Sequence, residues 1–236
     1  MNQILVNEKV YVTPKLKKKK KFYKFQFTVS IIIVLILLGL FIRSELIERK
    51  GEKVSQNILS DFSSIDSTVA DDTIIVALSD NAEELEKEPQ ILEQFNTVYK
   101  TASGTEYRVD SILNIPSLEI NYPVLSHSDT ELLKISINKF WGGEPNSVGN
   151  YCIVGHNYDG KDIFFGKLHK IKIGDSVELQ DKTGKVVKYK VYNIFTVQPT
   201  DVACTSQLTN GKTEMTLITC NNGGKTRLIV KCRAEE

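Results

Sequence analysis

The stretch that decides the fold of this chain is TLITCNNGGKTRLIV, residues 216–230. Its first part is an apolar, β-branched run that stops at Cys220, a pattern that predicts a buried strand with a thiol at its end. Residues 221–224 are Asn-Asn-Gly-Gly and favour a tight turn, because Asn and Gly tolerate the positive φ that hairpins need. The chain then returns through Arg227 into a second apolar strand. The sequence therefore predicts a thiol and a guanidinium on neighbouring strands of one hairpin.

Upstream of the hairpin, short β-type runs separated by turn signals begin at about Tyr107. Single helical turns or short helices are expected only near residues 129–134 and 164–171. Many short strands with few helices predict a mainly β fold, a closed or nearly closed β-barrel over residues 107–236. The expected strands before the hairpin cover residues 108–115, 118–124, 150–154, 176–179 and 186–197.

The N-terminal part of the chain predicts a membrane anchor. Residues 1–24 form a lysine-rich tail, and residues 25–42 are almost uninterrupted Ile, Leu, Val and Phe. Such a run is about long enough to cross a hydrocarbon core roughly 30 Å thick. Lysines before the span and acidic residues after it predict a cytoplasmic N-terminus and an extracellular remainder. A cleaved signal peptide is the alternative, and it is disfavoured because no small-x-small site follows the apolar run.

Between the anchor and the predicted barrel, residues 43–106 are expected to form an extracellular spacer of helices and linker. Residues 61–72 are rich in Ser and Asp and predict a linker. An apolar patch at residues 74–78 and a helix start at Asn81 follow. The formal net charge of +1 hides the contrast between a basic tail and this acidic segment. Because the anchor explains the basic run, we expect no nucleic-acid partner.

The four cysteines are Cys152, Cys204, Cys220 and Cys232. They show no C-x-x-C or Cys/His ligand spacing, so the sequence predicts no metal site. A disulfide framework is possible, but an external domain of this length does not need one. Cys152 shares strand parity with Val154 and His156, although core packing is its favoured role. Cys204 and Cys232 stay structural or unassigned.

Val154-Gly155-His156-Asn157 supplies a candidate acid or base for the thiol. A thiol attacks an amide only as thiolate, and cationic neighbours favour that form. Protonated His156 can give a proton to the leaving nitrogen and later take one from an incoming amine. Arg227 offers a fixed fork of donors for a developing oxyanion. Each residue alone is more often structural, but their joint presence favours catalysis. His127 and His169 lie in no motif.

The order of these residues resembles the sortases, membrane-anchored cysteine transpeptidases of Gram-positive bacteria. The resemblance rests on Gly-His-Asn at residues 155–157, Thr-Leu-x-Thr-Cys at 216–220 and Arg227 on the next strand. Ile-Pro-Ser-Leu-Glu-Ile at residues 115–120, Pro123-Val124, Gly149-Asn150 and Gly174-Asp175 are also similar to the family. The resemblance implies a sortase-type barrel with Cys220, His156 and Arg227 as catalytic residues, and Thr219 and Asn157 as substrate-binding residues.

The resemblance also implies a substrate, a surface protein with a C-terminal sorting signal of the LPxTG type. Its acyl part would form a thioester on Cys220 and pass to an amine of a peptidoglycan precursor or of a pilin lysine. No cofactor is implied; some relatives bind calcium through loop carboxylates, but those positions are not matched here. The implied location is the cell membrane, with a single span and an extracellular catalytic domain.

Two alternatives to a transpeptidase remain open: a cell-wall cysteine peptidase that uses water, and a membrane-tethered binding module on an inactive barrel. Within the resemblance, a class D-like or A-like enzyme is favoured. The loop at residues 198–213 is too short for the helix-bearing insertion of class B sortases. The Gly-His-Asn and Phe165-Gly166-x-Leu168 segments nevertheless look B-like.

Overall fold

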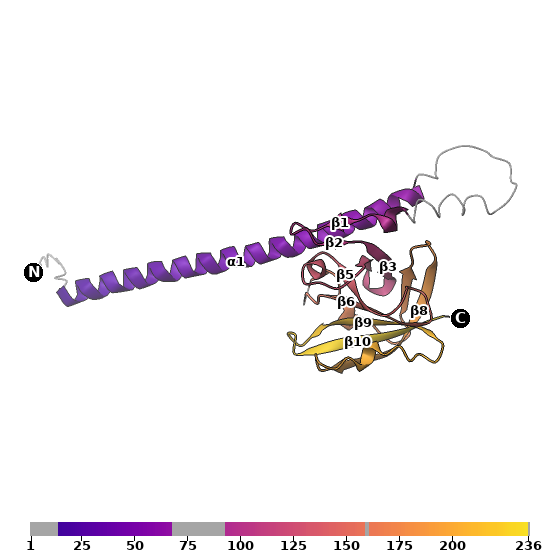
Figure 1. Ribbon diagram of the computed structural model, residues 1–236. Helices are drawn as coiled ribbons and strands as arrows, with labels where there is room; N and C mark the ends of the chain where they lie inside the picture. Colours follow the sequence, from indigo (N-terminus) through magenta and orange to yellow (C-terminus); the bar gives the residue numbers. More distant parts are fainter. Residues whose placement is uncertain (1–13, 68–92, 159–160, 236) are drawn as a thin grey trace, which may run out of the picture. The chain divides into compact units, whose positions relative to one another are not determined.

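Figure 1 shows the computed structural model, which describes residues 14–67, 93–158 and 161–235. The chain divides into two compact units, residues 1–47 and residues 48–236. The apolar patch at residues 74–78 and the helix start at Asn81 lie outside the described residues.

The N-terminal element is a single long helix, α1 (Pro14–Ser67). Among the described residues, one helical stretch, Lys18–Phe62, is long and apolar enough to cross a membrane. The predicted linker is wrong for residues 61–67, which continue the helix. Tertiary packing explains the difference: Ile58 is buried, and the Phe62 ring lies 4.7 Å from the Phe95 ring between centroids. Packing of an apolar face overrides the weak helix propensity of Ser and Asp.

The second unit contains the predicted closed β-barrel, which the structure confirms. In the described residues its strand order is β10-β8-β7-β3-β4-β5-β6-β9. Six of the eight neighbouring pairs are antiparallel, whereas β4 with β5 and β6 with β9 are parallel. Strands that run parallel end at the same edge, which brings the residues after β6 beside the end of β9. The bounds are β3 Val109–Ile115, β4 Ile120–Leu125, β5 Ile137–Trp141, β6 Gly149–Gly155, β7 Ser176–Gln180, β8 Val186–Val197, β9 Thr213–Asn221 and β10 Thr226–Ala234.

Strand β5 is absent from the sequence prediction. It is short, and a register shift between Lys139 and Trp141 interrupts its alternation. A bulge puts one extra residue against the partner strand and breaks the period of two that marks a strand. The sequence of β5 alone therefore does not show the alternation that identifies a strand, and its pairing with neighbouring strands is needed to recognise it.

The helix expected at residues 164–171 is reduced to one 3₁₀ turn, η3 (Leu168–Lys170). Phe164 has φ +50°, a left-handed conformation that a continuous helix does not contain. The other short elements are β1 Tyr99–Lys100, which pairs with β2 Glu106–Tyr107, and η1 Pro116–Leu118, η2 Leu132–Lys134 and η4 Ala203–Thr205.

A hydrophobic cluster attaches residues 48–62 of α1 to the barrel. Ile58 is buried in this cluster beside Tyr107, Val109, Leu125 and others. The Ser55 hydroxyl donates to Ser136 Oγ at 2.9 Å, and Ser136 in turn donates to the Pro123 carbonyl at 2.6 Å. The approach is close enough that a Cβ on Gly51 would lie 1.7 Å from the Lys134 carbonyl oxygen. This part of α1 is thus a packed element of the second unit.

Candidate active site

Cys220 and Arg227 lie directly opposite each other on β9 and β10. Opposite residues of an antiparallel pair point to the same face of the sheet, with Cβ atoms about 4.5–5.5 Å apart. The thiol and the guanidinium therefore share one face. Arg227 Nη1 donates to the carbonyls of Gly224 at 3.0 Å and Thr226 at 3.2 Å. The predicted hairpin is confirmed, and its turn has the expected positive φ at residues 222–224.

His156 follows β6 at the same edge of the barrel. The register of the parallel pair places Gly155 opposite Thr219, so the next residues, His156 and Cys220, come side by side. The imidazole is half-buried and lies 5.3 Å from the Tyr158 ring between centroids. Burial lowers the pKa of His156 from its usual value, Lys134 lowers it further, and Glu48 opposes the shift. The neutral imidazole is thus favoured, and its conjugate acid is a stronger proton donor.

Two hydrogen bonds tie the ends of β6 and β9 together. Asn157 Nδ2 donates to the Cys220 carbonyl at 2.9 Å, and the Thr219 hydroxyl donates to the Gly155 carbonyl at 2.8 Å. Thr219 is buried, whereas Asn157 is half-buried. Both side chains hold backbone next to the thiol, and their substrate-binding role stays a prediction. Among the described residues, Asn157 Oδ1 is a buried acceptor without a hydrogen-bond partner.

Gly155 lets His156 approach the barrel closely. A Cβ at this position would lie 2.7 Å from both Ile137 Cγ2 and Phe165 Cδ2. The same segment is fixed by a hydrogen bond from the Phe165 amide to the His156 carbonyl at 3.1 Å. A residue with a side chain would therefore displace the histidine or its neighbours.

An apolar groove of about 280 Å³ extends from Arg227 along the same outer face. Its floor includes Val154, Ile218 and Ile229, which lie two residues from His156, Cys220 and Arg227 and share their faces. The loop between β8 and β9, residues 198–212, forms one wall. The other lining residues are Ser128, Leu133, Phe140, Val197, Pro199, Asp201, Val202, Cys204 and Thr205.

Comparison with known proteins decides the family. The Sortase domain family matches residues 113–235, more than half of the chain. This chain belongs to the sortase family. It is 30% identical over 119 residues to sortase A of Bacillus anthracis, a match that covers 50% of this chain and 55% of that protein. The chain spans 55%, 60% and 51% of the length of three curated sortase A relatives, from Bacillus anthracis, Listeria monocytogenes and Streptococcus agalactiae.

Solved sortase structures share the fold. A sortase D5 transpeptidase of Clostridium perfringens is 24% identical, and the match covers 65% of this chain and 98% of that chain with a TM-score of 0.52. A lid mutant of sortase A from Corynebacterium diphtheriae is 22% identical, covers 77% of this chain and 93% of that chain, and also has a TM-score of 0.52.

Sequence reasoning missed the contribution of α1 to this sortase site. Glu48 forms an ion pair with Lys161, and the two side chains are 17% and 33% exposed. Glu48 raises the pKa of both His156 and Tyr158 by its charge. No signal in the sequence links Glu48 to the histidine, because a residue in an acidic spacer looks like any solvated carboxylate.

The remaining three cysteines are not part of the group formed by Cys220, His156 and Arg227. Cys152 is fully buried with Ile218 and Ile229 on the outer face of the sortase barrel, and Cys204 packs against this cluster. Burial raises the pKa of Cys152 to about 12 and raises that of Cys204 and Cys232. A raised thiol pKa leaves little thiolate at neutral pH, so these three groups are poor nucleophiles.

The other histidines have local partners. His127 Nδ1 lies 3.3 Å from Ser126 Oγ, and His169 Nδ1 lies 3.0 Å from the Gly166 carbonyl. Within the part of the chain that the structure describes, no group of three His, Cys, Asp or Glu side chains could hold a metal ion.

Proposed function

We propose that this chain is a cysteine transpeptidase that cuts a C-terminal sorting signal and transfers the acyl part to an amine. The observation that carries the proposal is the register that sets Cys220 opposite Arg227, with His156 at the adjoining strand end. Family membership supports the same assignment. Each of the three groups has a role that the other two cannot perform.

In the first half-reaction, the Cys220 thiolate attacks the scissile carbonyl carbon and a carbon–sulfur bond forms. Arg227 donates hydrogen bonds to the oxyanion that develops on the carbonyl oxygen. The carbon–nitrogen bond then breaks, and the His156 imidazolium gives its proton to the leaving amine. The acyl part of the substrate remains as a thioester on Cys220.

In the second half-reaction, an amine attacks the thioester carbon. Neutral His156 accepts the proton that the amine loses, a carbon–nitrogen bond forms, and the Cys220 thiolate leaves. The lowered pKa of His156 suits this step, because the neutral base is the favoured form near neutral pH. The cycle ends with thiolate and imidazolium restored, the imidazolium being the less populated but more acidic form of His156, and no other group is consumed.

The substrate we infer is a surface protein with an LPxTG-like sorting signal. The apolar groove next to Arg227 has the size and lining to take the Leu-Pro part of such a motif. The acceptor would be a peptidoglycan precursor or a pilin lysine, and the subclass D-like or A-like.

We also infer the location. The apolar helix is consistent with a membrane anchor. Lysines before residue 25 and acidic residues after residue 43 favour a cytoplasmic N-terminus and an extracellular barrel.

The test is intact-protein mass after incubation with sorting-signal peptides. The full chain in detergent should gain the mass of a peptide's acyl part, and Cys220→Ala should gain nothing. Adding an amine acceptor should convert the adduct into ligated product. Hydrolysed product only would make the chain a cell-wall peptidase. A third result would be that a peptide binds but forms no adduct, while iodoacetamide alkylates Cys220 at the rate of a free thiol. The chain would then be a binding module on an inactive barrel.

A further inference from the structure

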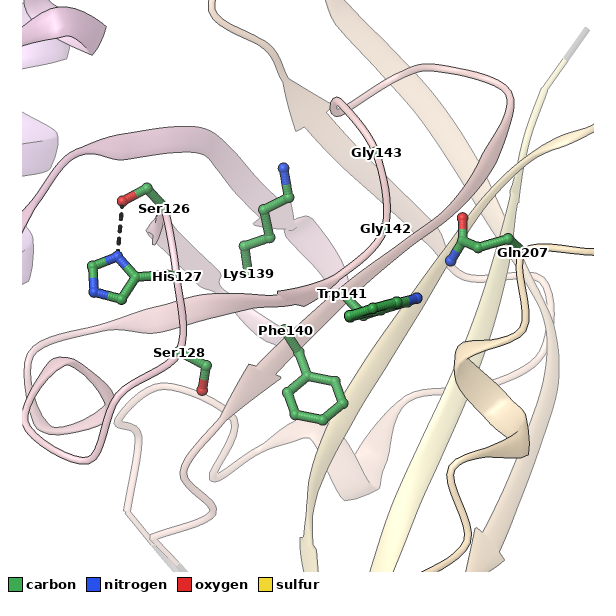
Figure 2. Close-up of a pocket in the computed structure, with 9 residues that line it drawn as sticks. All are labelled: Ser126, His127, Ser128, Lys139, Phe140, Trp141, Gly142, Gly143 and Gln207. Carbon is green, nitrogen blue, oxygen red and sulfur yellow. Dashed lines mark hydrogen bonds between the residues drawn. The ribbon is translucent and has the colours of Figure 1, made fainter.

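A second, larger cavity of about 650 Å³ adjoins the groove and has no role in the mechanism above. Figure 2 shows its lining side chains coming from three segments: the turn at residues 126–128, strand β5 with the following glycines, and Gln207 of the β8–β9 loop. The strand contributes Lys139, Phe140 and Trp141. The cavity and the groove share Ser128 and Phe140, so they adjoin at these two residues.

The aromatic side chains of this cavity are unusually exposed. Trp141 is 60% exposed and Phe140 is 46% exposed, although both are large and apolar. The bulge in β5 makes this arrangement, because it breaks the alternation that would turn one of two successive residues inward. Exposed aromatic groups gathered at a cavity mark a binding site more often than an accident of the surface.

The walls of the cavity are held in place. Gly142 has φ +105°, and a Cβ there would lie 2.3 Å from the Asn150 carbonyl oxygen. The side-chain amide of Gln207 makes two hydrogen bonds to the backbone of Asn150. Its Oε1 accepts from the Asn150 N–H at 3.0 Å, and its Nε2 donates to the Asn150 carbonyl at 2.9 Å. The loop that walls the groove is thus fastened to β6 beside Trp141. The cavity is therefore a preformed feature of the barrel.

The cavity favours an uncharged, apolar ligand group. Its cation, Lys139, forms an ion pair with Asp110 at 3.2 Å, and its side chain is 17% exposed. An anionic ligand would therefore have to compete with a buried carboxylate for this charge. Phe140 and Trp141 present flat apolar surfaces, which suit an aromatic or branched aliphatic side chain.

The strand register gives the distance from the thiol. Trp141 is opposite Cys152, and Cys152 is opposite Thr216, four residues before Cys220. Four residues of strand span about 13 Å, and two strand spacings add about 10 Å across the sheet. The direct path is about 16 Å, which an extended peptide covers in about five residues. The side chain above Trp141 is thus the fifth or sixth counted back from the scissile carbonyl.

We propose that this cavity binds an aromatic or branched aliphatic side chain one or two positions upstream of the four-residue sorting motif. The inference rests on the proposed function, because the acyl part of the peptide must stay held in the groove while the acceptor amine arrives. The four-residue motif binds in the groove, and the residues that precede the motif bind in the cavity that adjoins the groove at Phe140. The cavity makes upstream sequence part of the specificity of this chain.

The chain provides its own probe, because Trp141 is its single tryptophan. Two peptides without tryptophan would share one motif and carry either Phe or Ser at the upstream position. Titrated into Cys220→Ala, which cannot turn over, the Phe peptide should shift the Trp141 emission to the blue, because it covers the exposed indole. The Ser peptide should leave the emission unchanged at concentrations where it is bound.

Turnover supplies the second measurement. Wild type should use the Phe peptide about tenfold better in kcat/KM, with the difference in KM, since burying one aromatic side chain contributes about 1.4 kcal/mol or more. Trp141→Ala should use both peptides equally. Ile173→Ala, which removes another exposed apolar side chain and lines neither cavity, should keep the preference.

The two measurements separate this proposal from the proposed function. Cleavage of both peptides without an emission shift, or a preference that survives in Trp141→Ala, would overturn the subsite and leave the transpeptidase intact. An emission shift with the Phe peptide but no thioester in wild type would keep the subsite and refute the activity. A shift with a soluble muropeptide instead of the sorting peptide would assign the cavity to the acceptor and refute the proposal.

Discussion

Glu48 of helix α1 forms an ion pair with Lys161, five residues after His156 along the chain. The carboxylate is thereby brought close enough to raise the pKa of the His156 imidazole. Lys134 of η2 lowers the same pKa by its charge, and the Tyr158 ring lies 5.3 Å from the imidazole between centroids. An ion pair on the helix that also carries the apolar span thus contributes to the electrostatics of the site.

Removing the negative or the positive member of this ion pair should shift the pKa of His156 in opposite directions. Glu48→Gln removes a negative charge that stabilises the imidazolium, so the pKa of His156 should fall. Lys161→Gln removes the cation that offsets Glu48, so the pKa should rise. An NMR titration of the imidazole signals, with His156→Gln for assignment, measures both.

Glu52→Gln is the matched control, because it makes the same charge change one turn further along α1, where Glu52 accepts a hydrogen bond from Tyr122. The pKa of His156 should stay near the wild-type value in this variant. If the Glu48–Lys161 pair had a purely structural role, Glu48→Gln and Lys161→Gln would move the pKa of His156 in the same direction. That result would contradict the electrostatic account.

Substitution of His156 or Arg227 should lower activity far more than substitution of Arg233, a charged residue on the same strand as Arg227. His156→Ala and Arg227→Ala should each lower kcat by at least about two orders of magnitude, as removal of an acid/base or an oxyanion donor does. Arg227→Lys should recover little, because a single ammonium lacks the fork of donors. Initial rates of peptide cleavage give the values.

Arg233→Ala provides the comparison on the same strand. Arg233 donates to Glu214 at the other end of β10. Its loss should change kcat by less than about twofold, in line with a partly exposed ion pair. A near-normal rate in His156→Ala would refute the mechanism.

The hydrogen bond from Thr219 to the Gly155 carbonyl should contribute to stability. Thr219→Val keeps the shape of the side chain but removes the donor of this buried bond. The free energy of unfolding should fall by about 1 kcal/mol or more, because the carbonyl loses its partner. Urea denaturation of the detergent-solubilised chain measures the change. An unchanged midpoint and slope would show that water or a shifted backbone replaces the bond.

The close contact at Gly51 should determine whether α1 stays on the barrel. In Gly51→Ala the new methyl group would meet the Lys134 carbonyl, so the helix must move away or strain. We expect a loss of about 1–3 kcal/mol and faster hydrogen exchange in residues 48–62. Mass spectrometry of exchanged peptides measures the second effect.

Gly39→Ala is the control for helix propensity, since no described atom lies within 4 Å of its Cβ position. Alanine is the better helix former, so this variant should show no loss of stability. Equal exchange rates in the two variants would mean that the contact of Gly51 with Lys134 does not hold the helix.

The sequence alone predicted the local features of the chain. The hairpin at residues 216–230 follows from apolar runs around Asn and Gly, and the apolar span and the barrel class follow from the pattern of residue types. These properties depend on neighbours in the chain, such as the sign of φ at a turn or the period of a strand. The candidate residues Cys220, His156 and Arg227 were found in the same way, from local motifs.

Only the tertiary structure decided the rest. A bulge interrupts strand β5, so its own five residues show no clear alternation of apolar and polar residues. Pairing with β4 and β6 makes this segment a strand. Glu48 and Lys161 are 113 residues apart and meet only because residues 48–62 pack on the closed barrel. Burial and charge pairing between distant residues depend on how the barrel closes, and this closure sets the surroundings of the histidine and exposes Trp141 beside the groove.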